Sequence, residues 1–425
     1  MKRGISLYNT SSTNPTGKKG TRCLICTGCG RCPGVIRGMQ VVTEKLELPP
    51  LTLQNPDGKR LMTVDIGTTT IAMQLYDMTG KVVDSFPSVN PQVSYGADVL
   101  SRIEAAKDPG KAADMQKKVR DLMEKGVQRF SQKLQPQETL QMVVAANTTM
   151  TYLFMGWNPE ELGKAPFTVS HSGAVETEIA GVACHIIPGL SAFVGGDITA
   201  GILASGMLEQ EASTLLIDLG TNGEMALGNR HRLHACATAA GPAFEGGANR
   251  GIWGADMVRL LQKLLEEGLM DGQGLLKEPY FTKGVRIGDV LVTKESVRAV
   301  QLAKGAIAAG IEILADSYGI RFSDISKVVL AGGFGYYLDP KAAVAIGLLP
   351  EELADCTVTG GNTALSGAAM VGSRILTAGG KQTAEGTLPD GGDDLRKRQE
   401  LQIRILNLAE EEKFPETFLT KINFN

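Results

Sequence analysis

The hydrophobic pattern of the chain contains the same short arrangement twice. In residues 61–75 an apolar stretch ends in Asp65, continues into Gly-Thr, and is followed by a run in which apolar positions alternate. Residues 215–227 repeat this order around Asp218. Because alternation with a period of two is typical of strands, each copy predicts a β-hairpin that carries Asp-x-Gly-Thr at its tip.

Between and after these hairpins the pattern changes to that of helices. Residues 297–316 carry an apolar stripe at helical spacing, formed by Val297, Val300, Ala303, Ile307, Ile311 and Leu314. A loop enters a helix near Asp197, and residues 361–372 form a second helix that is rich in small residues. Residues 328–331 predict a buried strand that runs into a glycine turn. Strands and helices that follow one another in this way predict an α/β fold.

The predicted organisation has five parts. Residues 1–45 form a basic arm with four cysteines, and residues 46–60, with three prolines, form a linker. Residues 61–212 and 213–375 form two similar halves, each opened by one hairpin. Residues 376–425 form a connector, followed by a strand and a short helix that return to the body.

Composition and charge narrow the classes of protein. With 425 residues, 43% hydrophobic and 21% charged, the chain has an ordinary globular composition. We expect a cytoplasmic protein, because no apolar run approaches the ~18 residues of a membrane span and the N-terminus lacks a signal sequence. Residues 1–43 hold seven basic residues and no acid, although the whole chain carries a net charge of −3. Such an arm is typical of contact with an anionic partner or cofactor, and a solvated tail is the alternative.

Four of the seven cysteines lie close together in the basic arm. Cys23, Cys26, Cys29 and Cys32 have the spacing C-x2-C-x2-C-x2-C, which in a cytosolic chain is typical of metal binding. Zinc sites usually have two knuckles with a longer stretch between them, whereas this run is similar to the loop of bacterial ferredoxins. The spacing therefore favours an iron–sulfur cluster over zinc, held by one chain or shared between two subunits. The other three cysteines, expected in the core, are Cys184, Cys236 and Cys356.

The two hairpin tips predict a phosphate site. Their glycines allow sharp turns with outward N–H groups, and the residues that follow add further donors for phosphate oxygens. Each aspartate ends a strand, where it can hold the hydrated Mg²⁺ of a nucleotide. Aspartic proteases carry the same Asp-x-Gly-Thr, but in an all-β chain, so the helices disfavour that interpretation. The candidate residues are Asp65, Gly67, Thr68, Thr69, Thr70, Asp218, Gly220, Thr221, Asn222 and Gly223.

In this order the motifs resemble those of the superfamily of sugar kinases, heat-shock chaperones and actin. The hairpin tips resemble its two phosphate loops, and Asp197 and residues 361–372 resemble its connecting elements. Residues 330–335 resemble its adenosine loop. The resemblance implies two ribonuclease-H-like subdomains, the actin-like ATPase fold, with a cleft for ATP and Mg²⁺ between them. It also implies that Asp197 orients or deprotonates the attacking water, and that the adenosine lies against Gly332, Gly333 and Phe334.

A closer resemblance is to reductive activators of corrinoid proteins. It rests on residues 90–98, Asn147-Thr-Thr-Met, residues 218–224 and residues 238–247, among them Glu245. Asn147 and Glu245 are polar residues in small-residue loops, and a role in a turn and a role in the cleft are equally expected. Members of the family pair an iron–sulfur module with an ATPase and return a Co(II) corrinoid to Co(I).

The expected cofactors are therefore ATP, Mg²⁺ and a [4Fe-4S] cluster. The expected partners are a corrinoid protein or another low-potential redox acceptor and an upstream electron donor, with no membrane and no nucleic acid. Two alternatives remain open. One is an activator of a different low-potential enzyme, such as a radical 2-hydroxyacyl dehydratase, and the other is a small-molecule kinase of the same fold. The resemblance leaves the oligomeric state open, a homodimer included.

The four-cysteine arm leads to a first prediction. Protein purified without oxygen is expected to be brown and to contain about four iron and four sulfide per cluster. The double variant Cys26→Ser with Cys29→Ser is expected to lose the absorbance near 400 nm and to keep the thermal unfolding of the body. Stoichiometric zinc without acid-labile sulfide, in protein never exposed to air, would contradict the cluster.

Overall fold

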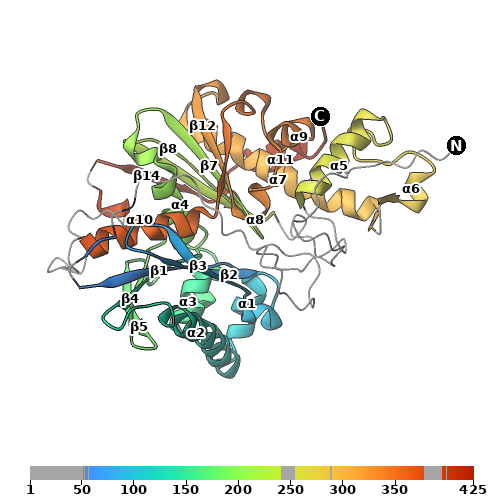
Figure 1. Ribbon diagram of the computed structural model, residues 1–425. Helices are drawn as coiled ribbons and strands as arrows, with labels where there is room; N and C mark the ends of the chain where they lie inside the picture. Colours follow the sequence, from blue (N-terminus) through green and yellow to red (C-terminus); the bar gives the residue numbers. More distant parts are fainter. Residues whose placement is uncertain are drawn as a thin grey trace, which may run out of the picture.

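The architecture is known from a computed structural model, which describes residues 51–240, 254–287, 290–377 and 395–425, apart from 52, 56 and 399. Within these residues the chain forms two six-stranded sheets, which repeat one topology (Figure 1). The cysteine arm expected at 1–45 lies outside the described residues. None of the helices in the described part has an apolar stretch long enough to cross a lipid bilayer.

The first sheet belongs to the first half and has the order β3-β2-β1-β4-β6-β5. Its strands are β1 (Lys59–Ile66), β2 (Thr70–Tyr76), β3 (Val82–Val89), β4 (Thr139–Ala146), β5 (Val175–Ile179) and β6 (Val182–Ile186). The first three strands form an antiparallel meander, and β4 lies parallel to β1 on its other side. The expected first hairpin is therefore β1–β2, with the Asp-x-Gly-Thr sequence at its tip.

The second sheet repeats this arrangement in the order β13-β12-β7-β8-β9-β14. Its strands are β7 (Ser213–Leu219), β8 (Gly223–Gly228), β9 (Arg232–Thr238), β12 (Ile325–Ala331), β13 (Thr357–Gly361) and β14 (Gln402–Leu406). Again three antiparallel strands are followed by a strand, β12, that lies parallel to the first of them. The two sheets thus confirm the internal repeat and the actin-like fold.

Helices cover the sheets. In the first half they are α1 (Val99–Ala106), α2 (Pro109–Ser131), α3 (Thr148–Met155) and α4 (Gly196–Ser205). The second half has α5 (Gly254–Glu266), α6 (Tyr280–Lys283), α7 (Lys294–Tyr318), α8 (Gly332–Gly335), α9 (Pro340–Ala345), α10 (Thr363–Thr377) and α11 (Phe414–Lys421), with the small hairpin β10 (Val285–Ile287) and β11 (Val290–Val292). The apolar stripe expected at 297–316 is the buried face of α7.

Two of these helices, α4 and α10, lie between the sheets (Figure 1). Each follows the strand that pairs in parallel with β4 or β12, namely β6 or β13, so they occupy equivalent places in the repeat. Their buried side chains form one apolar core with side chains from both sheets, among them Val143 and Leu216. The halves are therefore joined through a common core and not only through the connecting chain.

The crossing of α4 and α10 depends on small residues. A Cβ atom placed on Gly367 would lie 2.0 Å from the carbonyl oxygen of Ala200, and one on Gly201 would lie 3.0 Å from Thr363 Oγ1. Further along α10, a Cβ on Gly372 would lie 2.3 Å from the Leu61 side chain. The backbones thus approach as closely as glycine permits. The small-residue helix expected at 361–372 does pack tightly against a partner helix.

Both ends of the described body are held by packing. Leu53, placed in the linker by its sequence, is 1% exposed and belongs to the central core, and β1 already begins at Lys59. The strand and helix expected after the connector are β14 and α11, of which β14 extends the second sheet beside β9. The buried Lys304 of α7 donates to the carbonyl oxygen of Asn423, which fastens the C-terminal residues.

The helix crossing leads to a second prediction. Gly→Ala within a helix usually stabilises a protein, because alanine restricts the unfolded chain. At Gly367 we expect the opposite, a loss of about 1–3 kcal/mol, because the new methyl group meets the backbone of α4. The measurement is chemical denaturation of the two single variants Gly367→Ala and Gly173→Ala. A Cβ on Gly173 would meet nothing within 4 Å, so this control is expected to unfold like the wild type.

Candidate functional site

The two Asp-x-Gly-Thr tips meet where the halves face each other. The Thr69 and Thr221 hydroxyl groups are hydrogen-bonded at 3.0 Å, although the residues are far apart in sequence. Each turn is closed by its own glycine: Gly67 N–H donates to the Thr70 carbonyl oxygen and Gly220 N–H to that of Asn222, both at 2.9 Å. The tips therefore lie against each other where the two halves meet, and the residues predicted to bind phosphate are brought together.

The first tip is held from behind by three polar side chains. Asn90 Nδ2 donates to the Gly67 carbonyl oxygen at 2.8 Å, and the buried guanidinium of Arg102 donates to that of Thr68 at 2.6 Å. Asn147 Nδ2 donates to Thr68 Oγ1 at 3.0 Å, while its Oδ1 caps α3. These bonds fix the turn, and Arg102 adds a positive charge that favours an anion at the loop.

A row of residues crosses the second sheet at the second tip. In the register of the strands, Asp218 of β7 lies opposite Ala331 of β12 on one side and opposite Glu224 of β8 on the other. Glu224 in turn lies opposite Ala237 of β9. A Cβ on Gly332 would lie 2.4 Å from Asp218 Oδ1, so the glycine turn after β12 presses against this aspartate. Its φ of 81° is left-handed, which a side chain would also disfavour.

Two further carboxyl groups come from the first half. Asp65, at the end of β1, accepts a hydrogen bond from Asn362 Nδ2 at 2.7 Å, and Asn362 caps the start of α10 through a bond to Leu365 N–H. Asp197 lies in the first turn of α4, where its Oδ1 accepts from Ile198 N–H at 2.8 Å. Residues from β1, α4 and β7 are thus brought to one site by the two halves together.

Burial and like charge raise the pKa values of these acids. Burial raises the pKa of Asp65 to about 6, against a smaller lowering by Asn362. Burial, together with the charge of Asp65, raises the pKa of Asp197 to about 7. Burial and the charges of Asp197 and Asp65 raise the pKa of Asp218 to about 8. Burial also raises the pKa of Glu224 well above its usual range, with smaller contributions from Asp197 and Asp218.

This donor set fits a hydrated Mg²⁺ ion. Buried acids that repel one another are compensated by a divalent cation, and Mg²⁺ is usually held by one or two carboxylates, waters and phosphate oxygens. Within the described residues, no three His, Cys, Asp or Glu side chains are placed to enclose an ion by themselves. Asp65 and Asp218 could therefore hold the ion only together with water and a phosphate, which matches a site for a magnesium nucleotide.

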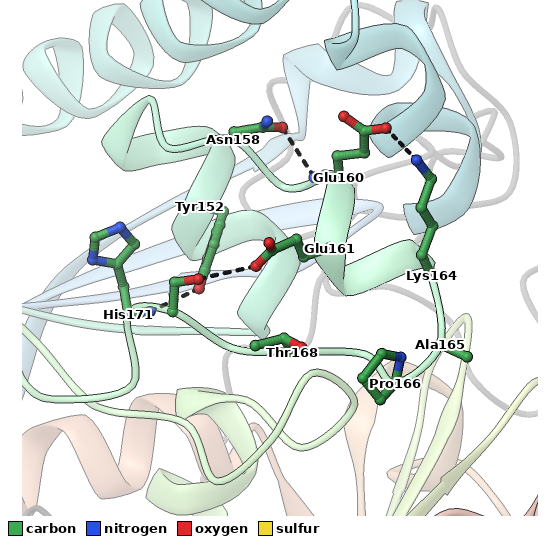
Figure 2. Close-up of a pocket in the computed structure, with 10 residues that line it drawn as sticks. Tyr152, Asn158, Glu160, Glu161, Lys164, Ala165, Pro166, Thr168 and His171 are labelled. Atoms are coloured by element: carbon green, nitrogen blue, oxygen red, sulfur yellow. Dashed lines mark hydrogen bonds and ion pairs between the residues drawn. The ribbon is translucent and has the colours of Figure 1, made fainter.

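Two cavities lie near this region. One, of about 470 Å³, opens between the halves beside Asn147, Asn222 and Glu224. The other, of about 600 Å³, is a polar depression next to α3 in the first half (Figure 2). In Figure 2 Lys164 extends to Glu160, and Glu161 accepts a hydrogen bond from Ser170 at 3.1 Å. In this second cavity Lys164 therefore compensates the charge of Glu160, and Glu161 is bonded to a neutral hydroxyl group.

The structure brings together most of the residues singled out in the sequence. Asp65, Asp197 and Asp218 are neighbours, and the two hairpin tips touch. Asn147, whose role was left open, both caps a helix and contacts Thr68.

Phe334, expected beside the adenosine, is 7% exposed and packs in the core of the second half. Glu245 and the cysteines Cys23, Cys26, Cys29 and Cys32 lie outside the described residues. Of the other cysteines, Cys184 and Cys236 are buried, as expected, and Cys356 is half-buried.

Sequence reasoning missed four residues of the site: Asn90, Arg102, Asn362 and Glu224. Asn90 and Glu224 stand inside motifs that the resemblance used, but nothing in their spacing gives them a contact. Arg102 lies in an ordinary helical stretch. Only its full burial marks it as part of the site, and the burial of one side chain cannot be read from the sequence. Asn362 reaches Asp65 across 297 residues of sequence, so only the tertiary structure could reveal the pair.

Known proteins share the fold and the family-specific sequence of this chain. The family model of the "RACo middle region" matches residues 61–210, and that of the "C-terminal domain of RACo the ASKHA domain" matches 212–250 and 248–377. ASKHA denotes the sugar kinase, heat-shock and actin superfamily. The solved structure of a "reductive activator for corrinoid, iron-sulfur protein" superposes with a TM-score of 0.73 at 27% identity, covering 87% of this chain and 67% of its own.

Two curated relatives are similar over shorter stretches. The corrinoid activation enzyme RamQ of Eubacterium limosum is 32% identical over 356 residues, which is 68% of this chain and 60% of RamQ. The [Co(II) methylated amine-specific corrinoid protein] reductase of Methanosarcina barkeri is 27% identical over 235 residues, 43% of each chain. The chain therefore spans about half of the length of these relatives, between 43% and 60%.

The raised pKa values lead to a third prediction, for metal-free protein. An acid whose pKa is higher in the folded than in the unfolded state stabilises the fold at low pH, and this stability is lost as pH rises through the folded value. For Asp218 this stability is lost between the ordinary pKa of about 4 and the folded value of about 8. In Asp218→Asn the amide resembles the protonated acid. The melting temperature of the variant is therefore expected to exceed that of the wild type at pH 8 and to equal it at pH 4.

The measurement is the melting temperature in EDTA from pH 4 to pH 8.5. Asp316→Asn is the control, because that aspartate is a half-exposed surface group on α7. If the melting temperatures of Asp218→Asn and of the wild type changed with pH in parallel, the raised pKa of Asp218 would be contradicted.

Proposed function

We propose that this chain, which belongs to the family of reductive activators of corrinoid proteins, uses Mg-ATP to drive a low-potential electron onto the Co(II) corrinoid of a partner protein. The observation that carries the proposal is the meeting of two Asp-x-Gly-Thr tips beside a group of half-buried acids, between halves that share one core. The names of the relatives support the acceptor, since each acts on a corrinoid or a corrinoid protein.

The residues of the cleft suit ATP hydrolysis. Asp65 and Asp218 would hold Mg²⁺, directly or through water, and the backbone and hydroxyl donors of both tips would bind the phosphates: Gly67, Thr68, Thr69, Thr70, Gly220, Thr221, Asn222 and Gly223. The Thr69–Thr221 hydrogen bond would give way to phosphate oxygens. Asp197, with a pKa raised to about 7, suits the removal of a proton from the attacking water near neutral pH. Gly332 and Gly333 would leave room for the adenosine.

Nucleotide binding can drive a change in the arrangement of the two halves, because both halves contribute residues to the site. Raising one electron by 100 mV costs about 2.3 kcal/mol. A ligand that binds the closed arrangement of the halves more tightly than the open one shifts their equilibrium by that difference in binding free energy. The glycine-packed crossing of α4 and α10 lies between the sheets, where such a change of angle would be centred. A difference in binding free energy of several kcal/mol would be enough to raise one electron by a few hundred millivolts.

The electron would come from the N-terminal arm. We propose a [4Fe-4S] cluster held by Cys23, Cys26, Cys29 and Cys32, which supplies one-electron chemistry at low potential. The seven basic residues of the arm would attract an acidic partner, so complex formation should weaken as salt rises. An upstream donor would reduce the cluster again. We place the protein in the cytoplasm, where thiols stay reduced and are free to ligate a cluster.

The fourth prediction tests the coupling of ATP to electron transfer. Anaerobic, pre-reduced protein is mixed with a Co(II) corrinoid protein, and Co(I) is followed by its absorbance. ATP is expected to be required for sustained formation of Co(I). Asp197→Asn is expected to bind Mg-ATP and to lose at least about a hundredfold in turnover, the size typical of a lost general base. Cys184→Ser, a change in the core of the first half, is the control and should keep both activities.

Two outcomes would decide against the proposal. Equal yields of Co(I) with and without ATP would remove the coupling, even if the protein hydrolyses ATP. ATP-dependent phosphorylation of a small acceptor, with no Co(I), would instead identify a kinase of the same fold.

A further inference from the structure

The cavity between the halves has the size of a site for a small molecule. Its volume is about 470 Å³, within the ~300–1000 Å³ usual for such sites. The first half contributes Ile103 of α1 and the loop residue Phe193, and the second contributes Ala306 of α7. The C-terminal segment closes it with Leu408 and Phe414. Most of the wall is therefore apolar, and it is built by segments far apart in sequence.

One end of this cavity is polar. Glu224, Asn222 and Asn147 lie there, and Asn222 Nδ2 donates to Glu224 Oε1 at 3.1 Å, which orients the carboxyl group. Among the described residues that line the cavity there is no lysine, arginine or histidine. An anion placed beside this acid would meet no compensating charge. The lining instead suits an uncharged ligand whose apolar body fills the cavity and whose N–H group reaches the polar end.

The cavity lies on the opposite side of the β7–β8 hairpin from the glycine turn. Gly332 presses against Asp218, which is the β7 member of the row across the sheet. Glu224 and Ala237, the members from β8 and β9, line the cavity. An adenosine at the turn and an occupant of the cavity would therefore be neighbours along the row, and the two ligands would share the second tip, since Asn222 lines the cavity.

We propose that this cavity is a second ligand site, which takes an uncharged, mainly apolar molecule with one N–H donor directed at Glu224. Both halves form its wall, so its width depends on the angle between them, as does the nucleotide cleft. The two ligands are therefore coupled: Mg-ATP changes the affinity of the cavity for its ligand, and the ligand changes the affinity for Mg-ATP by the same factor. Binding to the cavity does not depend on the identity of the electron acceptor.

The test uses the full chain, without oxygen, and the fluorescent probe N-phenyl-1-naphthylamine, which has an apolar body and one N–H group. We expect saturable binding of one probe per chain. 1-Anilinonaphthalene-8-sulfonate, which adds a negative charge to a similar body, is expected to bind at least about tenfold more weakly. N-methyl-N-phenyl-1-naphthylamine, which lacks the N–H group, is expected to lose about two- to tenfold, the usual range for one hydrogen bond.

Matched variants locate the probe. Ala239 lines the cavity and is exposed, so Ala239→Phe fills the space without disturbing the core, and it should abolish binding. Ala183→Phe adds the same ring at an exposed position of β6 and should leave binding unchanged. Leu100 is 61% exposed at the cavity, so Leu100→Glu is a second variant that the fold tolerates, and its charge should weaken binding.

The result that would overturn the proposal is equal binding of the probe by Ala239→Phe, Ala183→Phe and the wild type, or tighter binding of the sulfonate. Titrations with and without Mg-ATP then measure the coupling. We expect the dissociation constant of the probe to change with Mg-ATP, and that of Mg-ATP to change by the same factor with the probe. Site-specific binding with no such change would overturn the coupling. Failure of Co(I) formation would leave the probe results untouched, so the two proposals can fail separately.

Discussion

Three aspartates and one glutamate gather, each half-buried, where the two halves of the protein meet. Burying acids of like charge costs free energy, and proteins limit that cost by protonation, by hydrogen bonds or by a cation. Among the described residues, Asn362 donates to Asp65, Asn222 donates to Glu224, and backbone N–H groups donate to Asp197 and Glu224. The metal-free site therefore relies on protons, as the raised pKa values express. A site that is stable only with protons or a divalent cation is well suited to binding Mg²⁺ together with a phosphate.

The rest of the architecture keeps these acids in place. The register of β7, β8, β9 and β12 sets Asp218 and Glu224 side by side, and the close crossing of α4 and α10 sets the distance between the halves. Asn362, at the start of α10, connects this crossing directly to Asp65. A change in the angle between the halves would thus alter the surroundings of the acids, and a ligand that binds one arrangement more tightly would favour that angle. The same pair of surfaces also forms the wall of the apolar cavity.

The first tip is supported more heavily than the second. Asn90, Arg102 and Asn147 hold residues 67–68 from behind, whereas in the second tip Asn222 turns toward Glu224 and the cavity. The second loop is the one whose polar side chains face both the nucleotide cleft and the cavity, which places it where two ligands could influence each other.

The sequence by itself determined the repeat, the two hairpins and the acids at their tips, because these depend on local alternation and on turn residues. It also determined the small-residue helix, since only residues without bulk permit such a crossing. The tertiary structure alone decided which residues support those acids. Asn362 and Asp65 are 297 residues apart, the buried position of Arg102 has no signature in its own helix, and Glu224 becomes a neighbour of Asp218 only through the strand register. Contacts of this kind depend on how the elements pack, and a local pattern does not contain that information.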